Sequence, residues 1–433
     1  NNNAKVNLYL LYISEQDYLS ALKIIENLTN NKLINNKILL DKAFIYLKIN
    51  EINKCIEICN LILSEEKENI KAINLIGSCL LEEKKYKKAE DKFLLGISYE
   101  DKDIALLNSL GKLYFEIWNL EKAERFYKIA LKQNPNSYQT LNNLAGYYLE
   151  INKSNKALEY YFRALKLLPE EPTILNNIAK TYLSLKNIEE AEKYCLSALK
   201  IKGDDSFKKI LSIIKFHKMD FKSAWSYFDG RLGLNDFVKR NDSYQLIKTK
   251  LLQNKKIDPN KNLLIIREQG VGDEILYGTI YEDLLNTFSN TFIEIDERLK
   301  PLFISSFKKI HHNKFYKLGY FSKNIEKLKG FDQILYAGSL GYYFRNSLKS
   351  FSKKNYLHIS NTQIHKGLEK LRDFRKEFKI GLSWKSLNNS YANQKSLSLS
   401  DFDFIIKSSN VDFINLQYGD VNKEISSYNN NSE

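Results

Sequence analysis

Proline and glycine are scarce in this sequence, with 5 prolines and 17 glycines among 433 residues. This scarcity excludes collagen-like and extensively low-complexity chains. No apolar run reaches the roughly eighteen residues that a membrane-spanning helix requires, and no cleavable signal sequence is visible. We therefore expect a folded, helix-rich, soluble and cytoplasmic protein without a membrane span.

Cysteine is also rare, and none of the four cysteines belongs to a C-x-x-C pair. They lie in the first half of the chain, at Cys55, Cys59, Cys79 and Cys195. Cys55 and Cys59 are one helical turn apart, but no cysteine or histidine close by in sequence completes a metal site. We predict small core residues in a reducing compartment and no bound metal.

The chain is basic, with a formal net charge of +14 and a pI near 9.2. Such a balance often indicates a polyanionic partner. Here the lysines are spread evenly among abundant asparagine, isoleucine and tyrosine, so compositional bias explains the charge equally well. We predict no specific nucleic-acid partner.

Residues 2–205 repeat at an interval of about 34 residues, the period of tetratricopeptide units. Small residues occupy the same three positions in successive units, and we call these positions the small columns. Large residues recur at positions between them. Two antiparallel helices cross closely only where side chains are small. The pattern predicts an α-solenoid of six units near 2–35, 36–69, 70–103, 104–137, 138–171 and 172–205. The small columns are Gly77, Gly111, Ala145 and Ala179; Ala89, Ala123, Ala157 and Ala191; and Gly96, Ala130, Ala164 and Ala198.

Stacked units of this kind form a concave groove that binds an extended peptide or a partner helix. Asparagines fall at adjacent inner-helix positions of two consecutive units: Asn142, Asn143, Asn176 and Asn177. A ladder of asparagines can clamp a peptide backbone, because each amide offers a donor and an acceptor. A solvated helix surface explains them as well. The recurring aromatic columns are interpreted as core between helices.

Residues 206–260 are predicted to hold capping helices and a linker. Residues 206–227 indicate a helix pair or one long helix, with Phe221, Trp225 and Phe228 on one face. That face is expected to cap the solenoid, since a terminal repeat must cover its apolar end. Residues 232–260 indicate a linker or an extended covering segment.

From Asn262 the pattern changes to alternating strands and helices. Strands are predicted at 262–266, 291–295, 314–318 and 332–336, with helices at 273–287, 297–308 and 323–329. This alternation is typical of a doubly wound parallel sheet. A long helix at 362–377, a strand at 379–384, a helix at 400–407 and a strand at 412–417 follow. The tail from Asn422 shows no core pattern.

The turn after the first strand contains Gln269, Gly270 and Gly272, followed by Asp273. A strand, a tight turn and a helix N-terminus in this order can hold an anion such as a nucleotide diphosphate. The same spacing also fits a structural turn whose glycines only relieve backbone strain.

Several motifs occur together: Ala224-Trp225-Ser226-Tyr227 with Arg231, Glu268 to Ile275, Gly381 to Lys385, Lys395-Ser396-Leu397 and Asn415 to Asp420. In this order the chain resembles bacterial tetratricopeptide proteins with a glycosyltransferase-like domain, similar to O-linked N-acetylglucosamine transferases and ADP-heptose heptosyltransferases. The resemblance implies an α-solenoid followed by an α/β Rossmann-like GT-B domain. Its acceptor-side half would be residues 261–356, and its nucleotide-sugar-side half, 357–433, would be partial.

The resemblance also implies site residues. Asp273 is the candidate general base for the acceptor hydroxyl, although an aspartate there can equally cap its helix. Ser383, Lys385, Lys395 and Ser396 are candidates for stabilising the leaving diphosphate without a metal. A nucleotide-sugar would be the co-substrate, and no cofactor is expected.

Two functions follow from these patterns. The first is an inverting, metal-independent transfer of a sugar from a nucleotide-sugar to a protein or glycan recruited by the repeats. The alternative is a non-catalytic interaction scaffold that uses the repeat groove, with a degenerate or truncated transferase domain. Because the second α/β half is short for a nucleotide-binding half, we expect local instability near residues 380–433.

Overall fold

The protein was analysed in a computed structural model of 433 residues. The structure describes residues 2–15, 17–30, 35–233, 250–252, 256–268, 270–307, 314–317, 320–351, 355–372, 374–385, 396–407, 410–417 and 419–430. The chain forms two compact units, Asn1–Leu234 and Asn235–Glu433, which are described separately below.

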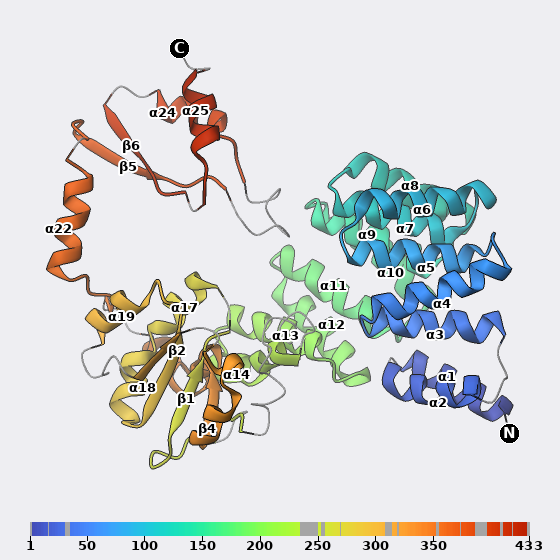
Figure 1. Cartoon of the computed structure of the whole chain (residues 1–433), viewed down its shortest axis with the longest axis horizontal. Coiled ribbons are helices and arrows are strands. Elements are labelled where there is room, and N and C mark those ends of the chain that lie inside the picture. The colour runs from blue at the N-terminus through green and yellow to red at the C-terminus, as the bar shows by residue number, and fades with distance from the viewer. Residues whose placement is uncertain are drawn as a thin grey trace. The chain divides into compact units, whose positions relative to one another are not determined.

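The first unit consists of consecutive antiparallel helix pairs, so the predicted solenoid is confirmed (Figure 1). We call the two helices of each pair, in chain order, the first helix and the second helix. The pairs are α1 (Asn2–Ser14) and α2 (Tyr18–Asn30); α3 (Asn36–Lys48) and α4 (Ile52–Glu65); α5 (Ile70–Glu82) and α6 (Tyr86–Tyr99); α7 (Ile104–Glu116) and α8 (Leu120–Gln133); α9 (Tyr138–Glu150) and α10 (Ser154–Leu167); α11 (Pro172–Ser184) and α12 (Ile188–Ile201).

Helix caps and turn conformations recur at the repeat interval. Most of the first helices begin after a polar residue whose side chain accepts a hydrogen bond from a backbone N–H of the first turn, as at Asn35, Asn69, Asp103 and Ser137. In the second to sixth pairs, the turn between the two helices contains one residue with positive φ, and these residues share the repeat interval. They are Asn50, Lys84, Trp118, Asn152 and Lys186.

The small columns lie where helices cross. All nine alanines of these columns are fully buried. A β-carbon on Gly77 would lie 2.4 Å from the Phe93 ring, and one on Gly111 would lie 2.5 Å from the Tyr127 ring. Large rings therefore fill the space that the small residues leave open.

A seventh helix pair follows, formed by α13 (Asp205–His217) and α14 (Phe221–Phe228) and then the 3₁₀ helix η1 (Asp229–Gly233). The interval from the sixth pair to this pair is one residue shorter than the repeat interval. Met219 has the positive φ here, and Ala224 takes the place that Ala191 holds in the preceding pair. Phe216 contacts the rings of Phe221, Trp225 and Phe228, at centroid distances of 6.3, 4.7 and 6.0 Å. The predicted aromatic face is therefore present.

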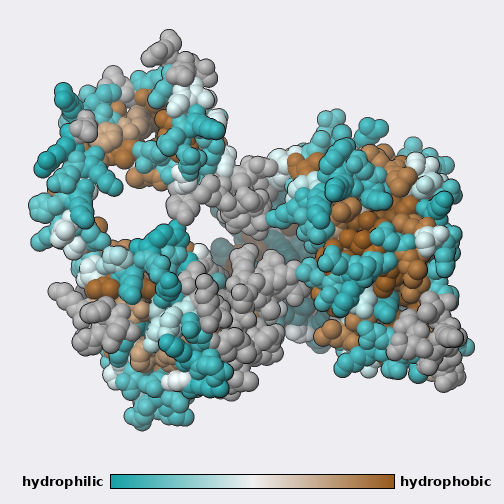
Figure 2. Space-filling model, viewed as in Figure 1, coloured by the Kyte–Doolittle hydropathy of each residue, from teal (hydrophilic) through white to brown (hydrophobic). Residues whose placement is uncertain are grey.

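The surface of the first unit is not uniformly polar. Leu61 and Leu94, on the second helices α4 and α6, are 54% and 42% exposed. Figure 2 shows apolar patches among polar side chains on the face of this unit that is turned to the viewer. The unit therefore offers both polar and apolar surface to a partner.

We expect Gly146→Ala to raise the free energy of unfolding of the repeats by about 0.5–1 kcal/mol, because alanine restricts the unfolded chain and favours a helix interior. A β-carbon at Gly146 would meet only the Tyr161 hydroxyl, at 3.6 Å. Gly111→Ala is the matched comparison and should be destabilising. Urea unfolding measures both variants, and a loss of stability at Gly146 would contradict the packing described here.

The second unit contains a four-stranded sheet in the order β3-β2-β1-β4, with every neighbouring pair parallel. The strands are β1 (Leu263–Ile266), β2 (Thr291–Ile295), β3 (Phe315–Lys317) and β4 (Gln333–Tyr336), at the predicted positions. Beyond β4, Leu251 forms a parallel bridge with Ile334, so part of the segment 232–260 covers this edge. Residues 234–249 lie outside the described residues.

Short helices connect these strands: α17 (Val271–Gly278), α18 (Tyr281–Thr287), α19 (Lys300–Ser306), α20 (Tyr320–Lys323), η3 (Ile325–Gly330), η4 (Ala337–Ser339), α21 (Leu340–Phe344) and η5 (Leu348–Ser350). The single helix predicted at 273–287 is wrong. Arg345 donates a hydrogen bond to the Thr279 carbonyl at 2.7 Å, and the helix is interrupted there because this carbonyl is taken by a side chain.

The last part of the chain contains α22 (Asn361–Lys370), β5 (Phe378–Leu382), η6 (Leu399–Phe402), α24 (Asp403–Ile406), β6 (Val411–Asn415) and α25 (Asn422–Asn430). Strands β5 and β6 pair in parallel. The predicted helix 362–377 is too long, because the Lys376 N–H is bonded to the Asp412 carboxylate at 2.8 Å instead of to a helical carbonyl. The tail is also not featureless: Ile425 and Tyr428 of α25 pack against Trp384, Leu399 and Val421.

Candidate functional site

The first helices of the repeats carry a ladder of polar side chains that bond from one unit to the next. Three equivalent hydrogen bonds form it: Ser109 Oγ to Asn74 Oδ1 (2.8 Å), Asn143 Nδ2 to Asn108 Oδ1 (3.4 Å) and Asn177 Nδ2 to Asn142 Oδ1 (3.0 Å). In each, the donor belongs to the later unit. We call this surface the ladder face, defined by Asn74, Asn108, Ser109, Asn142, Asn143, Asn176 and Asn177.

The ladder ends at Asn176. Its Oδ1 is buried and has no hydrogen-bond partner in the structure, and the residue is 2% exposed. In the shortened register of the seventh pair, Ile210 occupies the position that Asn177 has in the sixth, and isoleucine has no donor to offer. The change of register thus terminates the row of hydrogen bonds.

The structure joins two of the four predicted groove asparagines directly, Asn142 and Asn177, and it bonds Asn143 to Asn108. An asparagine amide has two donor hydrogens and two acceptor lone pairs. One bond between Asn142 and Asn177 therefore leaves further donors and acceptors on both. Asn142, Asn143 and Asn177 are half-buried, whereas Asn176 is buried. The sequence did not reveal that Asn74, Asn108 and Ser109 extend the ladder.

In the second unit, charged side chains gather where parallel strands end. Arg267 directly follows β1, and Asp296 directly follows β2. The Arg267 guanidinium forms ion pairs with Glu274 of α17 and with Asp296, the latter at 3.4 Å. Glu274 also accepts the Asp296 backbone N–H at 2.9 Å, and Arg298 binds both Asp296 oxygens at 2.8 and 2.9 Å. We call Arg267, Glu274, Asp296 and Arg298 the edge network.

In the edge network, burial and hydrogen-bond partners shift the pKa of a carboxylate in opposite directions. Burial raises the pKa of Glu274, and the Asp296 N–H and the Arg267 guanidinium oppose that rise. Hydrogen bonds from Arg298 lower the pKa of Asp296 to about 2. The network therefore holds its two carboxylates in different electrostatic environments at the carboxyl edge of the sheet.

We expect the second unit to lose stability as the pH falls from about 4 to about 2, because the pKa of Asp296 in the fold is below the ordinary value of about 3.9. Stability from the ionised Asp296 is complete above the ordinary pKa and disappears as the carboxylate is protonated. Urea unfolding across this range should show a shallower pH dependence for Asp296→Asn. An unchanged pH dependence would contradict the role of Arg298.

The glycine turn lies at the same edge. Neither Gly270 nor Gly272 has a positive φ, and a β-carbon on Gly272 would meet nothing within 4 Å. Strain relief therefore does not explain these glycines. The Asp273 carboxylate accepts the Gly270 N–H at 3.1 Å, so it caps α17. Gln269, the third predicted turn residue, lies outside the described residues.

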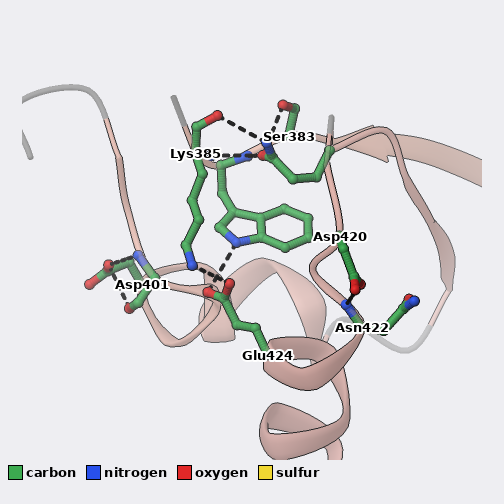
Figure 3. A network of polar contacts seen from close by, with 9 residues as sticks. Ser383, Lys385, Asp401, Asp420, Asn422 and Glu424 are labelled. Carbon is green, nitrogen blue, oxygen red and sulfur yellow. Dashed lines mark hydrogen bonds and ion pairs between the residues drawn. The ribbon is translucent and has the colours of Figure 1, made fainter. Parts of the chain in front are cut away.

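Two of the four residues predicted to bind a diphosphate, Ser383 and Lys385, belong to a polar cluster around Trp384 (Figure 3). Gln417 Oε1 accepts hydrogen bonds from the Ser383 hydroxyl (3.2 Å) and from the Lys385 N–H (2.7 Å). Lys385 Nζ is ion-paired with Glu424 of α25, which also accepts the Trp384 indole N–H at 3.1 Å. Ser396 precedes Leu397, whose N–H donates to the Trp384 carbonyl at 2.9 Å. Lys395 lies outside the described residues.

Sequence reasoning missed Arg267 and Glu274. The available signal was an arginine directly after a fully apolar strand and an acidic residue one helical turn into the next element. Sequence reasoning likewise assigned no role to Asp296. Among the residues that the structure describes, no group of three His, Cys, Asp or Glu side chains is arranged to hold a metal ion.

Comparison with known proteins supports the reading of the first unit. A tetratricopeptide-repeat family model matches residues 172–205, which contain α11 and α12. The chain carries tetratricopeptide repeats. The equivalent hydrogen bonds and turns in the preceding pairs show the same architecture there. Within the described ranges, no helix combines the length and apolar character needed to cross a bilayer.

Relatives resemble parts of the chain. Protein FlbA of Caulobacter vibrioides is 27% identical over 176 residues, which are 38% of this chain and 30% of that protein. A tetratricopeptide repeat protein of Parabacteroides merdae aligns at 14% identity over 57% of this chain and 98% of its own, with a TM-score of 0.41. A Pseudomonas aeruginosa pilF structure aligns at 17% identity over 49% and 96%, with a TM-score of 0.39. The glycosyltransferase resemblance stays a prediction.

Proposed function

We propose that this protein binds an extended segment of another protein along the ladder face, and thus acts as an interaction module. The observation that supports this proposal is the ladder of hydrogen bonds. Three equivalent rungs in consecutive units present amide groups at regular steps, and an extended peptide offers backbone donors and acceptors at regular steps of its own. A repeat array with such a face suits a linear ligand.

The internal rungs favour binding because they orient the amides before the ligand arrives. A side chain that is already held loses less rotamer freedom when a peptide binds. Asn142 and Asn177 are half-buried and held by one bond to each other, so their remaining donors and acceptors are pre-positioned. This explains why a partly satisfied ladder suits recognition better than a row of free surface asparagines.

The test is a selection of random twelve-residue peptides with free carboxyl termini against the full chain. Selected peptides should bind Asn142→Ala/Asn177→Ala at least about tenfold more weakly, since several hydrogen bonds are lost. The matched control is Asn60→Ala/Asn155→Ala, which removes exposed asparagines from the second helices α4 and α10. Failure to select any peptide, or equal binding by both double variants, would overturn the proposal.

A second candidate function is transfer of a sugar from a nucleotide-sugar, through a Rossmann-like GT-B domain in the second unit. The observation that favours it is the all-parallel sheet whose charged residues and open Gly272 lie at the carboxyl ends of the strands, where such sheets bind ligands. Asp273 would take the proton of an acceptor hydroxyl as that oxygen attacks the anomeric carbon and the nucleoside diphosphate leaves. Ser383, Lys385, Lys395 and Ser396 would stabilise the departing diphosphate.

Calorimetric titration of the full chain with UDP, ADP and GDP tests this second function. Because Lys385 is paired with Glu424, a diphosphate must compete with that carboxylate, so Glu424→Gln should strengthen binding and Lys385→Ala should abolish it. Asp273→Asn retains an oxygen that can accept the Gly270 N–H, yet removes the base, and should therefore lower turnover without unfolding the domain. Absence of binding by any of the three nucleotides would contradict the transferase reading.

A further inference from the structure

The helix α1 lies at one end of the row of helix pairs and exposes apolar side chains (Figure 1). Leu8 and Leu11 are 42% and 51% exposed. Because they are three residues apart, they share one face of the helix. Single exposed leucines are ordinary on a protein surface, so the position of this pair within the repeat decides what the exposure means.

In the later pairs the same positions belong to the core. At the repeat interval, Leu8 corresponds to Ile76, Leu110, Leu144 and Ile178, and Leu11 corresponds to Ile45, Cys79, Leu113, Tyr147 and Thr181. None of these residues is more than 5% exposed. The second pair differs at one of the two positions, where Lys42 corresponds to Leu8.

These positions are buried because they pack against the preceding pair. Ile76 and Cys79 of α5 belong to one core cluster with Tyr46 of α3 and Ile62 of α4. In the same way, Ile45 of α3 belongs to a cluster that includes residues of α1 and α2. This face of a first helix is therefore a packing surface for other helices, and on α1 it is largely open.

Opposite charges lie at the two ends of the open face. Lys5 is one helical turn before Leu8, and Glu15 is one turn after Leu11. Within the part of the chain that the structure describes, neither Lys5 nor Glu15 forms an ion pair. If two copies of α1 pack antiparallel, Leu8 of each copy meets Leu11 of the other, and Lys5 of each comes near Glu15 of the other. The face is thus complementary to itself under a two-fold axis.

We propose that α1 is a self-association surface through which two copies of this chain pair antiparallel. Leu8 and Leu11 form the apolar centre of the contact, and Lys5 and Glu15 form its charged rim. This inference is independent of peptide binding, because the ladder face is carried by α5, α7, α9 and α11. One helix face per copy is small beside the roughly 1,600 Å² of a stable interface, so the dimer is weak and reversible.

Sedimentation equilibrium of the full chain at about 5–100 µM tests the apolar centre, since this range covers the dissociation constants of weak dimers. The parent should show a monomer–dimer equilibrium, and Leu8→Glu/Leu11→Glu should stay monomeric. The matched control is Leu61→Glu, which places the same charge at a leucine of α4 that is 54% exposed. This control should dimerise like the parent. All these substitutions are at exposed side chains, and thermal unfolding checks that the variants are folded.

Exchanging the charges tests the antiparallel arrangement. Lys5→Glu and Glu15→Lys each bring like charges together at both ends of the contact, so each variant alone should dimerise about tenfold more weakly. An equimolar mixture of the two variants should recover the parent's affinity, because opposite charges then meet between them.

Three results would overturn this inference. A parent that stays monomeric over the whole concentration range would show that a partner of another kind covers the face. A dimer that survives Leu8→Glu/Leu11→Glu would place the contact on another surface. A mixture of the charge variants that stays as weak as each variant alone would exclude the antiparallel pairing. Peptide binding to the ladder face is measured separately, so each of these results leaves the proposed function intact.

Discussion

Replacing Phe93 by alanine is expected to lower the free energy of unfolding of the repeats by about 4 kcal/mol. The Phe93 ring is fully buried in the main core cluster of the first unit and lies against Gly77, where only a glycine leaves room for it. Removing the ring takes away its buried apolar area and leaves a cavity where α5 and α6 cross. Because repeats are stabilised by their neighbours, hydrogen exchange should accelerate most in α5 to α8.

Phe162→Ala is the matched control. Phe162 is 37% exposed and contacts Tyr182 and Tyr194 only at the surface, with centroid distances of 6.5 and 6.0 Å. Its loss should cost about 1 kcal/mol or less. Hydrogen exchange by mass spectrometry together with urea unfolding compares the two variants. Equal losses would show that Gly77 and Phe93 do not form the contact on which the packing account depends.

Replacing Glu274 by methionine should destabilise the second unit by about 3–5 kcal/mol. Glu274 is 2% exposed, and its two oxygens hold the Arg267 guanidinium and the Asp296 N–H. Without it, the largely buried Arg267 keeps a charge that only the more distant Asp296 compensates. Hydrogen exchange of peptides covering β1 and β2 measures the loss.

The double variant Arg267→Met/Glu274→Met should recover most of that stability, because it removes both charges at once. Arg298→Met provides the comparison with an exposed ion pair. Its side chain is 55% exposed, so the expected cost is about 0.5 kcal/mol. A double variant as unstable as the single one would contradict the explanation by an unpaired buried charge.

The solenoid could be predicted from the sequence because its determinants are local and periodic. Small residues such as Ala123 and Ala157 must recur at helix crossings, and nothing larger fits. At 206–227 the sequence indicated a helix pair or one long helix but not a seventh repeat, because the register shifts by one residue and Ser212 and Ala224 leave the columns. A period search at a fixed interval does not detect such a shift.

Side-chain partners between units were harder to predict. The asparagines were visible in the sequence, but which amide bonds to which depends on how neighbouring helices cross. The pairing of Asn177 with Asn142, and not with its column neighbour Asn143, follows from that geometry. In the same way, the contact of Cys79 with Cys55 and Cys59 in one core cluster brings together side chains from two helices.

In the second unit, strand positions were predicted well and site chemistry less well. The strands are short apolar runs such as Leu263–Ile266, whose burial the sequence shows directly. The partners of Arg267 and Lys385 come from elements seven and thirty-nine residues away and depend on the tertiary fold. The capping bond of Asp273 is local, and the sequence had raised it as one of two alternatives.

The measurement that tests the central claim most directly is hydrogen exchange of the full chain with and without a selected peptide. If the ladder face is the binding surface, the peptide should slow exchange in α7, α9 and α11, and Asn142→Ala/Asn177→Ala should abolish this protection. Protection confined to the second helices or to the second unit would contradict the account, and so would protection that survives in the double variant.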